Sequence, residues 1–159
     1  MATIENHGAR AATERREDSR LLRRLMLGVM LVGIAGLMAE LLLLEHYDGV
    51  WQWIPLVCLG AGFVASAAVW LRPSRGAVRV LRALSVVYIA AGALGVYLHM
   101  DGNIEFEREL NASLTGLPLL VEALRGATPA LAPGALAQLG LLGLVLAYRH
   151  PALRRVQND

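Results

Sequence analysis

Two histidines and six acidic residues are the side chains of this chain with the clearest capacity for chemistry. Each lies near an end of an apolar stretch. They are Glu40, Glu45, His46, Asp48, His99, Asp101, Glu105 and Glu107. Imidazole nitrogens and carboxylate oxygens bind divalent metals such as zinc. The set is therefore a candidate site for a divalent metal ion, although the sequence has no H-E-x-x-H or E-x-x-H motif to support that assignment.

A solvated turn is the simpler interpretation of the acidic segment that begins at Asp101. Charged side chains around the sequence Asp101-Gly102-Asn103 are typical of an exposed loop, and we favour that interpretation for these acids. Oxygen-bearing residues at alternate positions from Asp101 to Glu109 also resemble the start of a calcium-binding loop. That resemblance fails because Phe106 stands where the loop needs glycine and Ala112 where it needs a bidentate glutamate.

Two stripes of small residues lead toward the candidate site along separate apolar segments. Gly33, Gly36 and Glu40 share one helical face. The second stripe steps by three and four residues through Ser85, Tyr88, Gly92, Gly95 and His99. We infer that the two helices touch through these glycines, which would bring Glu40 toward His99. An unpaired carboxylate at that depth costs on the order of 3 kcal/mol, so Glu40 needs a partner or a proton. His46 is an equal candidate for that partner. Alternatively, the glycines only permit packing and each polar end meets water.

Composition places the elements that position these residues in a lipid bilayer. The chain is 56% hydrophobic and only 18% charged, unlike an ordinary soluble domain. A helix crosses a hydrocarbon core of roughly 30 Å with about 20 apolar residues. Four segments come close, at residues 25–44, 53–71, 80–98 and 133–148, and the short fourth segment borrows length from residues 127–132. The sequence thus predicts an all-α integral membrane protein whose residues 25–149 form a four-transmembrane-helix bundle.

The placement of arginine predicts the orientation of this bundle. All fifteen basic residues other than histidine are arginine, and only Arg108 and Arg125 lie outside residues 1–24, the 72–82 connection and the C-terminal end. Because Arg-rich short loops stay in the cytoplasm, we expect a cytoplasmic basic tail at residues 1–24 and a cytoplasmic C-terminal tail at residues 150–159. The arginine-only, alanine-rich composition suggests a GC-rich bacterial genome, and hence the bacterial inner membrane.

The predicted outer loop, residues 99–132, is long enough to carry structure of its own. Leu117, Leu120, Val121 and Leu124 recur at helical spacing, with charged residues on another side. This pattern predicts a short amphipathic helix that lies on the outer membrane interface between the third and fourth spans. A re-entrant segment is disfavoured because the eleven residues from Leu114 to Leu124 are too few to cross the bilayer.

Three classes of function are compatible with this sequence: a structural or accessory membrane protein, a cation-binding protein or transporter, and a metal-dependent enzyme. We favour a structural or accessory component of a membrane assembly, whose partners are the lipid bilayer and further copies of the chain or other membrane subunits. The alternative is a cation- or metal-binding protein with a His/carboxylate site at its outer face, acting as a transporter or a metal-dependent enzyme. No charged residue midway along a span marks a transport path.

We lean against an enzyme because no nucleophile and base stand in a recognised spacing. The sequence has no P-loop, dinucleotide-binding fingerprint, G-x-S-x-G or paired-cysteine motif. Nucleic acid is not an expected partner, because the arginines flank apolar segments without interleaved aromatic residues. Anionic lipid headgroups explain the arginines better.

Overall fold

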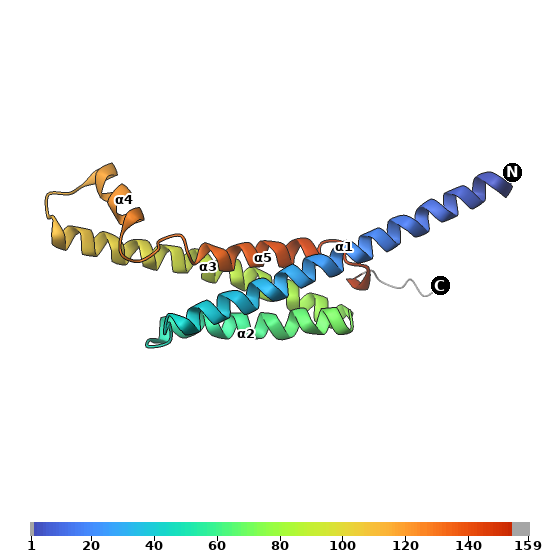
Figure 1. Cartoon of the computed structure of the whole chain (residues 1–159), viewed down its shortest axis with the longest axis horizontal. Coiled ribbons are helices and arrows are strands. Elements are labelled where there is room, and N and C mark those ends of the chain that lie inside the picture. The colour runs from blue at the N-terminus through green and yellow to red at the C-terminus, as the bar shows by residue number, and fades with distance from the viewer. Residues whose placement is uncertain (1, 154–159) are drawn as a thin grey trace.

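The described part of the chain consists of five α-helices and one short 3-10 helix (Figure 1). The computed structural model describes the backbone of residues 2–153 and the side chains of residue 10 and residues 13–153. The elements are α1 (Ala2–Leu43), α2 (Val50–Leu71), α3 (Arg75–Leu110), α4 (Gly116–Arg125), α5 (Gly134–Ala147) and the 3-10 helix η1 (Pro151–Leu153). The predicted all-α class is confirmed. Arg154 and Arg155 of the predicted C-terminal tail lie outside the described residues.

Three helices of the described chain are long and apolar enough to cross a membrane, at Thr13–Leu43, Val50–Leu71 and Arg75–Leu110. No more than 33% of the residues in any of their apolar windows are buried inside the protein, so most apolar side chains face outward. That is the pattern expected of helices whose solvent is lipid. Helix α5 is apolar but has only 14 residues, about 21 Å in length against a hydrocarbon core of roughly 30 Å. The chain is therefore a candidate multi-pass membrane protein.

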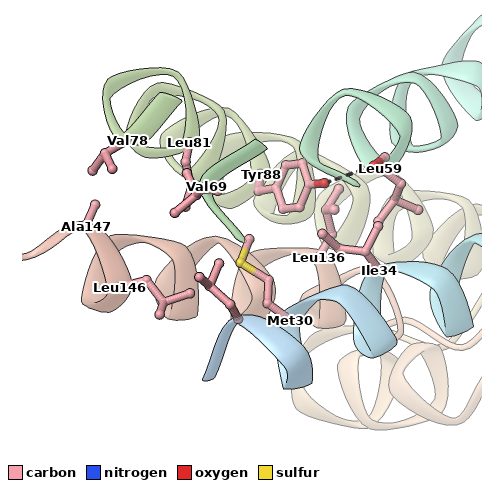
Figure 2. Packing of buried hydrophobic residues seen from close by; sticks show 11 residues of the cluster. Met30, Ile34, Leu59, Val69, Val78, Leu81, Tyr88, Leu136, Leu146 and Ala147 are labelled. Carbon is pink, nitrogen blue, oxygen red and sulfur yellow. Dashed lines mark hydrogen bonds between the residues drawn. The ribbon is translucent and has the colours of Figure 1, made fainter. Parts of the chain in front are cut away.

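Four helices pack in a ring around a common apolar core. Helix α1 contacts α2, α2 contacts α3, α3 contacts α5, and α5 returns to α1. Figure 2 shows the core residues supplied by all four helices, among them Met30, Leu59, Leu81 and Leu136. In a bilayer, where lipid offers helices little hydrophobic reason to associate, such a ring would depend on close van der Waals packing.

The glycine stripe of α3 packs against α5, so the expected contact of the first and third spans through their glycines is wrong. Within the described residues, α1 and α3 are not among the extensively packed pairs, since they lie diagonally across the ring. A methyl group placed on Gly92 would lie 2.7 Å from the backbone nitrogen of Ala137 and 2.9 Å from the carbonyl oxygen of Pro133. On α1, Gly36 has open space around it. Small residues on α3 thus accommodate a different partner from the one inferred.

Small residues of α5 pack against α3 in the same way. A methyl group on Gly140 would lie 2.5 Å from the carbonyl oxygen of Ser85 and 2.8 Å from the side chain of Ile89. The hydroxyl of buried Ser85 lies against Gly143 and donates a hydrogen bond of 2.7 Å to the carbonyl oxygen of Leu81 within its own helix. The backbones of the two helices therefore pack directly against each other, and the contact between α3 and α5 is the most extensive in the fold.

A buried tyrosine joins α3 to α2 on the other side. Tyr88 is 1% exposed, and its hydroxyl occupies the space beside Gly62 that a larger side chain would fill. The hydroxyl donates a long hydrogen bond of 3.4 Å to the carbonyl oxygen of Leu59, drawn as a dashed line in Figure 2. The polar end of this side chain is thus satisfied inside the apolar core.

Two helices extend well beyond the predicted spans. Helix α1 begins at Ala2, so the predicted N-terminal tail continues the first span as one helix. Helix α3 continues through Leu110, about 18 Å past the expected end at residue 98. No proline interrupts residues 99–110, and Gly102 alone does not break the helix. Figure 1 shows α1 and α3 projecting from opposite ends of the bundle.

An arginine on α1 holds the C-terminal end of α5. The Arg23 guanidinium donates hydrogen bonds to the carbonyl oxygens of Leu146, at 2.6 Å, and Tyr148, at 3.1 Å. The last carbonyls of a helix lack partners within the helix, so a cation there satisfies them and complements the helix dipole. The end of α5 is thereby placed beside the start of the apolar part of α1.

Replacing Gly140 by alanine should separate α5 from α3. The added methyl meets the α3 backbone, which cannot rotate away, so we expect a loss of about 1–3 kcal/mol and a lower thermal unfolding temperature in detergent. Gly36→Ala is the matched control, since that position is open and alanine gains about 0.5–1 kcal/mol of helix propensity. Equal melting temperatures for the two variants would contradict the packing described.

Candidate functional site

The structure brings together two of the eight predicted site residues, His46 and His99. Their ring centroids lie 6.3 Å apart with the ring planes tilted by 59°. His46 belongs to the turn between α1 and α2, and His99 lies on α3 where that helix leaves the bundle. Both side chains are partly buried. Residues more than fifty positions apart in sequence therefore meet at one end of the bundle.

The end of α1 fixes the position of His46. Its backbone nitrogen donates to the carbonyl oxygen of Leu41 at 2.9 Å, and the preceding Glu45 has a left-handed φ of 51°. This is a common way to end a helix, in which one left-handed residue lets the chain turn back on the last carbonyls. The amide oxygen of Gln52 then accepts from the backbone nitrogens of Asp48 and Gly49, at 2.7 and 3.1 Å, and starts α2. The short turn holds His46 between two helix ends.

A backbone carbonyl orients the ring of His99. Its Nδ1 lies 3.1 Å from the carbonyl oxygen of Pro129, in the connection between α4 and α5. A carbonyl only accepts, so Nδ1 carries the proton and donates it. In the neutral imidazole this leaves the lone pair on Nε2.

Partial burial disfavours the charged form of His46. Desolvation lowers the pKa of His46 below its ordinary value, and the neighbouring His99 lowers it further. Both effects disfavour a positive charge on the imidazole. At neutral pH the His46 ring is therefore a lone-pair donor that can take a proton or a metal ion.

The predicted acidic residues do not join the histidines in one cluster. Glu40, Glu45, Asp48, Asp101 and Glu105 are exposed, and Glu107 is partly buried. Across the part of the chain that the structure describes, no three or more His, Cys, Asp or Glu side chains are grouped so as to hold a metal ion.

Helical geometry accounts for the spread of the acids along α3. In a helix, alternate positions point in nearly opposite directions, so Asp101 and Glu105 share a face that Asn103 does not. The solvated turn expected at Asp101 is wrong, because this segment is helical. The eight-residue metal site remains a prediction, and His46 and His99 are the two members whose rings lie close together.

Asn103 is the organising residue that the sequence analysis missed. It is 2% exposed, and its amide nitrogen donates to the carbonyl oxygens of Ala123 at 2.8 Å and Thr128 at 2.6 Å. Its amide oxygen accepts from the backbone nitrogen of Thr128 at 3.2 Å, and Gly126 lies directly against it. A signal was present, because Asn103 continues the Ser85–His99 stripe by one further step of four residues.

Helix α4 carries two different apolar faces. Leu119 and Ala123 are buried, 4% and 0% exposed, in the packing of α4 against α3. The residues that predicted this helix point elsewhere: Leu117, Leu120 and Leu124 are 72%, 44% and 49% exposed. The predicted helix is present, and the leucines of its predicted apolar face remain uncovered within the chain.

We use the term α3–α4 arm for residues 99–126, which comprise the projecting end of α3, a short turn and α4. The arm has five carboxylates against two arginines, a net charge of −3 with His99 neutral. The ion pair between Glu122 and Arg125, at 3.7 Å, is exposed and contributes little. The arm thus combines an acidic surface with an uncovered leucine face.

No protein-family model, curated protein or solved structure matches this chain.

Removing the Asn103 amide should release α4 from α3. Asn103→Ala leaves the carbonyl and the N–H of Thr128 without this partner, and the carbonyl of Ala123 keeps only its 3.3 Å bond from the Gly126 nitrogen. Each buried group left unsatisfied costs about 1–3 kcal/mol. We expect faster hydrogen–deuterium exchange in residues 116–128 and unchanged exchange in α2. The control is Asn111→Ala, which removes only hydrogen bonds to Ser113 within the α3–α4 turn and leaves the bonds between Asn103 and residues 123–128 in place. Unchanged protection of α4 in Asn103→Ala would contradict this role.

Proposed function

We propose that the chain is a four-crossing protein of a bacterial inner membrane that serves as a structural or accessory component of a membrane assembly. Both termini are cytoplasmic in this proposal, with residues 1–24 and 150–159 as cytoplasmic tails and residues 25–149 as the transmembrane domain. Support comes from the arginines, because thirteen of the fifteen lie toward the proposed cytoplasmic side. The His46 turn and the α3–α4 arm then face outward.

Helix α5 is the fourth crossing in this proposal, despite its 14 residues. Its small face lies on α3, and Arg23 binds its C-terminal carbonyls beside the proposed cytoplasmic end of α1. Mostly apolar residues before α5, at 130–133, extend the apolar stretch beyond the helix. A short helix is tolerated where neighbouring helices cover it and the bilayer thins locally.

The exposed leucine face of α4 is the observation that carries the docking function. Buried Asn103 and Leu119 fix α4 on α3, and this leaves Leu117, Leu120 and Leu124 directed away from the chain. An apolar face beside polar, charged surface is typical of a site that binds another molecule. The α3–α4 arm is therefore the proposed docking surface.

The partner we infer is a membrane protein whose outward surface is apolar and basic. The arm carries a net charge of −3, so electrostatic complementarity favours a positive partner surface. Anionic lipid headgroups and the arm of a second copy both carry the wrong sign. Oligomers of this chain would then form through other surfaces, such as the lipid-facing sides of the spans.

A cation site at the outer face is the second candidate function. The specific observation in its favour is the approach of His46 and His99 to a centroid separation of 6.3 Å. This function does not require a partner protein. It is compatible with docking, because the histidines lie where α3 leaves the bundle and α4 lies farther along the arm.

Photo-cross-linking from position 120 tests the docking proposal. With a photoreactive residue in place of Leu120, we expect adducts to a membrane protein whose cross-linked segment is apolar and contains Lys or Arg. Leu117→Asn with Leu124→Asn should reduce the yield several-fold, and high salt should reduce it further because screening weakens charge attraction. Leu21→Asn with Leu22→Asn is the matched control, a pair of exposed leucines outside the arm and outside the proposed spans.

Two outcomes would contradict the docking proposal. One is a set of adducts formed only with lipid or with a second copy of the chain. The other is a protein adduct whose yield is unaffected by the two asparagine substitutions.

A further inference from the structure

We propose that His46 and His99 form a two-imidazole site for a late first-row transition-metal ion such as Zn²⁺, which fastens the α1–α2 turn to α3. This inference rests on the cation-binding candidate and is independent of the docking proposal. It narrows the eight predicted ligands to the two that come from different elements and meet in space. Imidazole nitrogen is a ligand that Zn²⁺, Cu²⁺ and Ni²⁺ share.

The separation of the two rings is close to that required by a shared metal ion. Metal–nitrogen bonds of about 2.0–2.1 Å place the centroids of two imidazoles on one tetrahedral zinc about 5 Å apart. The observed 6.3 Å exceeds this by roughly the displacement that a side-chain rotation produces. A tilt of 59° between the planes suits a tetrahedral ion, whose ligands need not be coplanar.

The hydrogen bond of His99 prepares that ring for metal binding. A metal-bound histidine usually donates its other ring N–H to a carbonyl or carboxylate, which fixes both the tautomer and the ring orientation. The carbonyl oxygen of Pro129, 3.1 Å from Nδ1, already fills this role. Nε2 is then the nitrogen left to bind the ion.

The end of α1 restrains His46 beside the proposed site. Its backbone nitrogen donates to the carbonyl oxygen of Leu41 at 2.9 Å. The turn after α1 therefore limits how far the imidazole can move away from His99.

Two protein ligands make this an open site. Closed structural zinc sites have four protein ligands, whereas an ion held by two imidazoles keeps positions for water or an external donor. Exposed Glu45 adjoins His46 in sequence and exposed Asp48 lies two residues after it in the same turn, so the local potential favours cations. We therefore expect an exchangeable ion that draws the turn onto α3 when bound.

Calorimetric titration with Zn²⁺ alone tests the site on the full-length chain in detergent, purified without a histidine tag and stripped with chelator. The wild type should bind Zn²⁺ near-stoichiometrically, and the ion should raise its thermal unfolding temperature. His46→Ala and His99→Asn should each weaken binding by about tenfold or more. The asparagine keeps an N–H donor at the place of Nδ1 while it removes Nε2, so the fold is preserved.

His150→Ala is the control, a partly buried histidine at the opposite end of the bundle, and it should bind like the wild type. The site is wrong if the wild type shows no saturable binding, or if His46→Ala and His99→Asn bind as tightly as His150→Ala. Failure of Zn²⁺ binding with cross-linking from position 120 intact would overturn this inference alone. Zn²⁺ binding without any protein adduct would instead overturn the docking proposal alone.

Discussion

The close approach of α5 to α3 is the constraint on which the rest of the structure depends. Glycines at positions 92 and 140 let the two backbones come together where a single methyl group would clash. In a bilayer, lipid would supply little hydrophobic force to hold them, so the contact would depend on dispersion between closely fitted surfaces. Helix α3 also packs against α2, α4 and η1. Without α5 on α3, the ring of four helices would be open and the short α5 would have no cover.

Helix α3 also positions residues beyond the bundle. The face of α3 that receives α5 through Gly92 and Gly95 continues to His99 and then to Asn103. His99 binds the carbonyl of Pro129, and Asn103 binds the carbonyls of Ala123 and Thr128. One continuous stripe therefore changes from small residues in the apolar region to hydrogen-bonding residues at its end. Close packing would suit the apolar part to a bilayer, and the polar side chains satisfy backbone carbonyls of α4 and of the connection after it.

Local features of the fold could be predicted from the sequence, whereas the pairing of elements could not. Hydropathy and helical spacing gave the three long apolar helices, α5 and α4, because those signals lie within each segment. The order of helices around the ring depends on which faces of small residues fit one another. Hydropathy does not reveal this, so the glycine stripes on α1 and α3 suggested a pairing that the structure does not contain. The end of α3 was misplaced because acidic residues after His99 suggested a loop, although most of residues 103–110 are good helix formers. Of the predicted site, His46 and His99 meet, while the acids are spread by the helical geometry of α3 and the turn before α2.

Membrane topology is the most direct test of the central proposal that α5 crosses the bilayer. Reporters that are active on only one side of the membrane would be fused after residue 126 and after residue 159 of the same chain. The proposal predicts that the shorter fusion reports the outer side and the full-length fusion reports the cytoplasm, because α5 returns the chain across the membrane. Both fusions reporting the same side would contradict the four-crossing bundle, and with it the outward placement of the α3–α4 arm and the His46–His99 pair.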